Sequence, residues 1–79
     1  MNTLALYPQA QNITFSEASI IIELIDGRTI SAPLVWFPRL SKASVKQLDN
    51  WELLGDGEGI HWPDIDEDLS INGLLLGTH

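Results

Sequence analysis

Apolar and polar residues alternate most clearly in the first half of the chain, within "SIIIELIDGRTISAPLVW". Residues 20–24 place two isoleucines and a leucine on one face at period two, which is typical of a half-buried strand. Asp26-Gly27 follows, and because both residue types tolerate positive φ angles, the pair predicts a type I′ hairpin turn. The return strand should end near Pro33. With a shorter strand over 12–15, the pattern predicts a small antiparallel β-meander.

The second half of the chain predicts two short helices on either side of a hairpin. Ser44 is a suitable N-cap for a helix over 45–50, because its hydroxyl can accept a hydrogen bond from a free backbone N–H. The stretch "WELLGDGEGIHW" predicts two strand arms around a glycine-rich turn. Ser70 and Gly77 mark the start and end of a last helix. The predicted fold class is therefore α+β: a small antiparallel β-meander followed by a short helix, a β-hairpin and a C-terminal helix.

Composition favours one small globular domain spanning residues 1–79. Of the 79 residues, 44% are hydrophobic and none is cysteine, which excludes disulfides and thiolate zinc sites and fits a reducing compartment. The amino-terminal stretch has no basic start followed by an apolar run, so no secretory signal is expected. The longest apolar run is far shorter than the ~20 residues that span a membrane. These observations predict a soluble cytoplasmic protein.

Charge is distributed unevenly along the chain, whose formal net charge is −7. Three of the four cations, Arg39, Lys42 and Lys46, fall within eight positions, and no lysine or arginine follows them. The acidic residues that follow would repel a phosphate backbone, since affinity for nucleic acids comes mainly from cations that release counterions. Direct binding of nucleic acid is therefore not expected. A small basic protein is the expected partner.

Two motifs, "WFPRL" and "GIHWPDIDEDLS", closely resemble those of the bacterial domain-of-unknown-function 2442 family. The resemblance extends from about Ile13 to Gly77 and implies a small α+β domain with the element order given above. Members of this family are often encoded beside another small protein, in arrangements that look like toxin–antitoxin pairs. The resemblance therefore implies a binding module, the antitoxin-like member of such a pair, and it implies no catalytic residues.

The second motif concentrates the candidate chemistry. His61, Asp64 and Asp66 offer a nitrogen and carboxylate oxygens to a divalent ion such as manganese or zinc, and with the acidic cluster at 64–68 they would make the chain a metal-binding or small-ligand-binding domain. An EF-hand is excluded, because the position for its invariant glycine holds a leucine. In the structural alternative, which we favour, the carboxylates accept backbone N–H groups in a turn and Arg39 pairs with one of them.

A non-catalytic protein-interaction module without a cofactor agrees better with this sequence than an enzyme does. The chain has neither a cysteine nor a G-x-S-x-G turn, and its glycine-rich turn lacks the spacing and the lysine of a phosphate-binding loop. Tryptophan is enriched at protein interfaces. We expect Trp51 and Trp62 to lie mainly in the core, and Trp36 with Phe37 to be partly exposed. The residues expected to contact a protein partner, or a second copy in a homodimer, are Trp36, Phe37, Arg39, Glu58 and Asp64.

Overall fold

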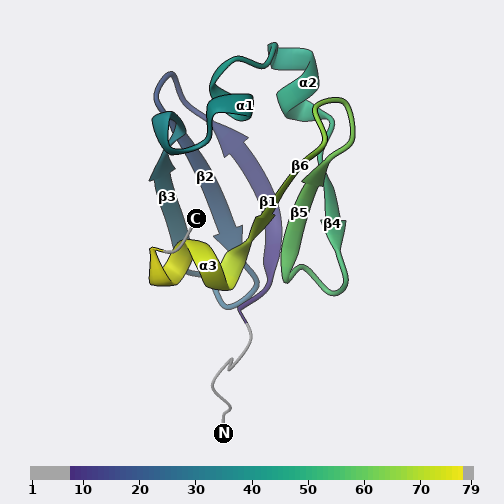
Figure 1. The fold of residues 1–79 in the computed structure, drawn as a ribbon. Coiled ribbons are helices and arrows are strands. Elements are labelled where there is room, and N and C mark those ends of the chain that lie inside the picture. Colours follow the sequence, from purple (N-terminus) through teal and green to yellow (C-terminus); the bar gives the residue numbers. More distant parts are fainter. Residues whose placement is uncertain (1–7, 78–79) are drawn as a thin grey trace, which may run out of the picture.

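The computed structural model describes residues 8–77, and over these residues it forms two three-stranded antiparallel sheets with short helices between and after them (Figure 1). The first sheet has the order β1-β2-β3 and the second the order β4-β5-β6. The predicted α+β class is confirmed. Residues 1–7 of the amino-terminal stretch considered for a secretory signal lie outside the described residues. In chain order the elements are β1 (Ala10–Phe15), β2 (Ser19–Leu24), β3 (Thr29–Pro33), the 3₁₀ turn η1 (Leu34–Trp36), α1 (Pro38–Ser41), α2 (Val45–Asp49), β4 (Glu52–Leu54), β5 (Gly59–Trp62), β6 (Glu67–Ser70) and α3 (Ile71–Leu76).

The turn between β2 and β3 lies where the Asp-Gly pair predicted it, but the predicted type I′ geometry is wrong. That geometry needs positive φ at both central residues, and among residues 8–77 the only non-glycine residue with positive φ is Asp66. The Gly27 N–H donates to the Leu24 carbonyl oxygen at 3.0 Å, and the Leu24 N–H donates to the Arg28 carbonyl oxygen at 2.8 Å. With Gly27 at φ 95°, the connection is a longer hairpin loop that ends in a left-handed glycine.

The third strand of the second sheet, β6, was not predicted from the sequence, and neither were η1 and α1. No strand was expected between the β-hairpin and the last helix. Residues 67–70 nevertheless form a strand, in which Asp68 pairs with His61 and Leu69 pairs with Ile60. Leu69 is buried and is the only apolar residue of this strand, so the period-two pattern is too short to be recognised.

The helix ends follow the predicted caps. Ser44 accepts a hydrogen bond from the Gln47 N–H, and the Gln47 side chain accepts one from the Ser44 N–H, which together form a capping box. The Ser70 hydroxyl accepts from the Gly73 N–H at 3.1 Å, and Gly77 ends the last helix in the left-handed conformation at φ 77°. In the described part of the chain, no helix is long and apolar enough to cross a membrane.

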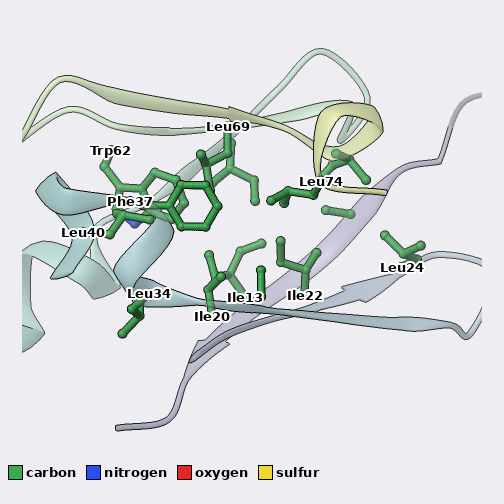
Figure 2. Packing of buried hydrophobic residues seen from close by; sticks show 14 residues of the cluster. Ile13, Ile20, Ile22, Leu24, Leu34, Phe37, Leu40, Trp62, Leu69 and Leu74 are labelled. Carbon is green, nitrogen blue, oxygen red and sulfur yellow. The ribbon is translucent and has the colours of Figure 1, made fainter. Parts of the chain in front are cut away.

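The hydrophobic core fills the space between the two sheets (Figure 2). Ile22 from the first sheet and Ile60 and Trp62 from the second are fully buried. The Trp62 indole N–H donates to the Leu48 carbonyl oxygen at 3.0 Å, so its buried polar atom is satisfied. The Phe15 ring meets the Trp62 ring edge to face at 6.3 Å between centroids. Burial of each such side chain contributes roughly 1.5–3 kcal/mol, and the core therefore joins the two sheets into one packed unit.

Candidate functional site

The turn between β5 and β6, residues 63–66, contains two of the predicted site residues and is fastened to two other elements. Arg39 on α1 donates from Nη1 to the backbone oxygen of Asp66 at 2.6 Å. Asn50, just after α2, donates from Nδ2 to the Asp64 carboxylate at 3.1 Å. The predicted anchoring of this turn by Arg39 is therefore found, but through a carbonyl oxygen rather than through a carboxylate. The turn serves as a structural connection among α1, α2 and the second sheet.

His61 lies in the middle of an acidic row on the outer face of the second sheet. The strand register places Glu52 on one side of His61 and Asp68 on the other. His61 Nδ1 is hydrogen-bonded to the Asp68 carboxylate. This bond raises the pKa of His61 above its ordinary value of 6.5, and the negative charges of Asp68, Glu52 and Asp66 act in the same direction, against the loss of hydration. The row therefore favours the protonated form of the imidazole.

The three predicted metal ligands are not brought together by the fold. His61 is bonded to Asp68, and Asp64 is bonded to Asn50 instead. Between residues 8 and 77 there is no group of three or more histidine, aspartate or glutamate side chains placed to hold a metal ion. The site predicted at His61, Asp64 and Asp66 lacks the shared geometry that a divalent ion needs.

The two aromatic residues predicted for partner contact differ in exposure. Trp36 is 42% exposed, whereas Phe37 is only 3% exposed, so the predicted exposure of Phe37 is wrong. Figure 2 shows Phe37 pointing into the core toward the second sheet. The Trp36 ring meets it edge-on at 6.3 Å between centroids. Of the tryptophans predicted for the core, Trp62 is fully buried and Trp51 is half-buried against the core.

The remaining partner-contact residues lie at two ends of the molecule (Figure 1). Trp36, Arg39 and Asp64 belong to the end formed by residues 34–50 and 63–66, which we call the helical end. Glu58 lies in the β4–β5 turn at the opposite end, where its backbone oxygen accepts a hydrogen bond from the α3 N-terminus at 3.0 Å. The five predicted residues therefore do not form one surface.

A groove at the helical end was not predicted from the sequence. It runs between β1 and α2 and encloses about 350 Å³. A wider, shallower depression adjoins it and shares Val45 and Asp49 with it. The sequence does contain one signal for this groove: Val45 is an apolar residue directly after the helix cap and outside the apolar stripe. In the structure its side chain is 75% exposed. The groove is lined by Ile13, Thr14, Phe15, Ser16, Val45, Leu48 and Asp49.

Comparisons with known proteins identify the family of this α+β domain. The chain matches the family described as "Protein of unknown function (DUF2442)" over residues 10–79, and it belongs to that family. A crystal structure of a protein of unknown function from Rhodospirillum rubrum has 38% sequence identity and a TM-score of 0.76, over 89% of this chain and 87% of that one. No curated protein matches the chain.

A second solved structure shares the fold at lower identity. It is a solution NMR structure of an uncharacterized protein from Chromobacterium violaceum, with 24% identity and a TM-score of 0.75 over 89% of this chain and 66% of that chain. The comparisons confirm the predicted family and the α+β fold. They name no activity, ligand or partner.

Proposed function

We propose that this protein is a non-catalytic protein-interaction module that binds a small basic protein partner. The observation that carries the proposal is the exposure of two neighbouring apolar side chains on η1, with Val35 77% and Trp36 42% exposed. The turn beneath them is fixed in place, because Leu34 and Phe37 are buried and the Phe37 N–H donates to the Leu34 oxygen at 2.9 Å. A tryptophan presented by such a fixed turn loses little conformational entropy on binding.

Tryptophan supports this proposal for energetic reasons as well. Its ring covers a large apolar area, and tryptophans are enriched among the few residues that dominate interface energies. Trp36 already rests edge-on against the buried Phe37, which props the ring against the core. An interface centred on this residue would bury Val35 as well.

The charge of the chain supports a basic partner. The net charge is −7, and the acidic row on the second sheet and the acidic β4–β5 turn, which lies opposite the helical end (Figure 1), both add negative potential to the surface. Such a field accelerates encounter with a cationic protein and disfavours acidic ones. In the antitoxin-like role that the family resemblance implies, the partner would be a small basic toxin-like protein.

The proposal is tested by affinity capture from an extract of the source organism, with the wild-type chain and the Trp36→Ala variant as baits. Leu76→Ala is the matched control, because Leu76 is 70% exposed and lies on α3, away from η1. We expect a small basic protein that is recovered with the wild type and the control, with and without EDTA. Trp36→Ala should reduce its recovery at least about tenfold, the range of a loss near 1.4 kcal/mol at an interface.

Three other outcomes would each count against the proposal. Equal recovery by Trp36→Ala and wild type would remove the η1 surface as the binding site. Recovery of the bait alone, dimeric by light scattering, would replace the hetero-partner with self-association. Capture that disappears in EDTA would instead support the metal-binding alternative built on His61, Asp64 and Asp66.

A further inference from the structure

The outer edge of β1 presents backbone groups to the groove beside α2. The Ser16 N–H donates to the Ser19 oxygen at 2.9 Å and closes the β1–β2 hairpin. Hydrogen-bonded pairs alternate along an antiparallel ladder, so Thr14 also bonds to β2, while the N–H and C=O groups of Ile13 and Phe15 point away from it. These two residues line the groove. Their backbone groups are therefore directed to the side on which another strand would pair.

The wall opposite β1 is suited to apolar side chains. Val45 on α2 is 75% exposed and Leu48 is partly buried against the core, and both line the groove. Its volume of about 350 Å³ lies within the range of pockets that hold ligands, roughly 300–1,000 Å³. At the amino-terminal end of β1 the outer edge is already paired, because the Ala10 N–H donates to the Gly57 oxygen at 2.7 Å. Only the carboxyl-terminal half of β1 is available for pairing.

The rim of the groove is acidic. Asp49 lines both the groove and the adjoining depression, and the depression adds Asp64 and Lys46. Two carboxylates against one ammonium leave a net negative rim on a chain whose total charge is −7. A segment that lies along the groove would therefore be favoured if it carried lysine or arginine beside its apolar residue.

The other sheet edges are less suited to pairing. On β3, the hydrogen bonds from Leu24 to Arg28 and from Leu34 to Ala18 fix the ladder so that Pro33, which has no N–H, faces the free edge. On β6 two acidic side chains, and on β4 one, protect short strands in the way that native edges are commonly protected. The edge of β1 beside the groove has no charged side chain.

From this juxtaposition we infer that the groove between β1 and α2 binds an extended, basic segment of a partner protein, which adds as a fourth strand to the first sheet. One apolar side chain of the segment enters the groove against Val45 and Leu48, and a neighbouring lysine or arginine meets Asp49 and Asp64. Backbone hydrogen bonds to Ile13 and Phe15 supply affinity, and the side-chain contacts supply selectivity. The inference rests on the proposed function as an interaction module and gives it a second contact surface.

The test uses the full chain and a displayed library of random twelve-residue peptides. We expect selected peptides to contain an apolar residue beside lysine or arginine. Titration of one synthetic peptide into the ¹⁵N-labelled protein should shift the amide signals of Ile13, Phe15 and Val45 first. Asp49→Lys should weaken binding, measured by fluorescence polarisation, at least about tenfold, whereas the control Leu76→Lys, on α3, should change it less than about twofold.

Backbone pairing is tested on the peptide rather than on the protein. Methylation of a peptide amide nitrogen removes one hydrogen-bond donor, and in a strand only alternate amides face the partner. We expect methylation at alternate positions to weaken binding about tenfold, and methylation at the positions between them to have little effect. Equal effects at all positions would overturn strand addition.

The remaining outcomes separate this inference from the proposed function. Selection of no peptide, or amide shifts that map to η1 alone, would overturn the groove as a docking site while leaving the Trp36 surface testable by capture. If the amide signals of the groove residues shift in the same way when the protein concentration is raised without peptide, a second copy of the chain is the occupant. This result would also overturn the inference. If Trp36→Ala no longer captures the partner but binds the peptide normally, the inference that the groove binds an extended segment stands.

Discussion

The β4–β5 turn and the β5–β6 turn are both short and acidic, yet they are held in different ways. The first, around Gly57, is fastened through backbone atoms: the Ala10 N–H donates to the Gly57 oxygen and the Ile71 N–H donates to the Glu58 oxygen. The second is fastened by side chains from outside the sheet, Arg39 and Asn50. Neither turn gathers its acidic side chains into a shared site.

This contrast shows that acidic residues in a short turn need no common function. In the β4–β5 turn the glycines determine the structure, because the backbone must approach another strand closely, and the acidic side chains between them are exposed. In the β5–β6 turn the structure depends on particular donors placed by α1 and the end of α2. The two turns should therefore respond to different substitutions.

The largest effect is expected from Gly57→Ala. A Cβ at this position would lie 2.5 Å from the Ala10 backbone oxygen, and the residue has φ +98°. Because the obstructing atoms all belong to the Ala10 backbone, there is little room to relax, and we expect the free energy of unfolding to fall by about 2–4 kcal/mol. Urea unfolding followed by tryptophan fluorescence measures the change.

Gly27→Ala is the matched control for this prediction. Its φ is +95°, but a Cβ there would meet nothing within 4 Å. It should lose only the backbone preference of glycine, about 1 kcal/mol. Equal losses of unfolding free energy in the two variants would mean that the close approach of Gly57 to Ala10 does not restrict a side chain at position 57.

The side-chain anchoring of the second turn predicts a smaller effect from Arg39→Ala. The variant loses the hydrogen bond to the Asp66 carbonyl oxygen, and because Arg39 is exposed we expect a loss of about 1 kcal/mol in the free energy of unfolding. Lys42→Ala, a neighbouring cation, should change it by less than about 0.5 kcal/mol. If the two variants were equally stable, the anchoring role of Arg39 would be excluded.

Much of the fold could be predicted because local signals agreed with the final packing. The repeated apolar residues of β2, the caps Ser44 and Ser70, and the left-handed Gly77 each act within a few residues of themselves. The Asp-Gly turn was placed correctly, but its type depends on how many residues the two strands leave unpaired. That number is set by the register, which the dipeptide alone does not determine.

The candidate site was less predictable because it depends on contacts between distant segments. The groove needs Phe15 and Leu48 on the same side of the core, and no local pattern reports that placement. The burial of Phe37 depends on where η1 ends and on how its ring packs among the other residues of the core. Arg39 was assigned to the correct turn, but only the fold decides whether it meets a carbonyl oxygen or a carboxylate.

Asp66 distinguishes a structural turn from a metal site. It has φ 51°, a conformation that aspartate and asparagine tolerate better than other residues with a Cβ. Asp66→Ala should therefore lower the free energy of unfolding by about 0.5–1 kcal/mol, and Asp66→Asn by less than about 0.5 kcal/mol, with or without added manganese or zinc. A metal-dependent rise in melting temperature that Asp66→Asn abolishes would contradict the structural role.

The smallest effect, a pH dependence, belongs to the acidic row beside these turns. Because the bond to Asp68 raises the pKa of His61 in the folded chain, the folded state holds this proton more tightly than the unfolded state does. The resulting stabilisation is complete below the ordinary value of 6.5 and is lost as the pH rises through the higher folded pKa. We expect the free energy of unfolding, measured in urea between roughly pH 5.5 and 8.5, to decrease across this window, and His61→Gln to flatten that decrease. A wild-type chain that gains stability over the same range while His61→Gln does not would show that Asp68 does not hold the imidazolium.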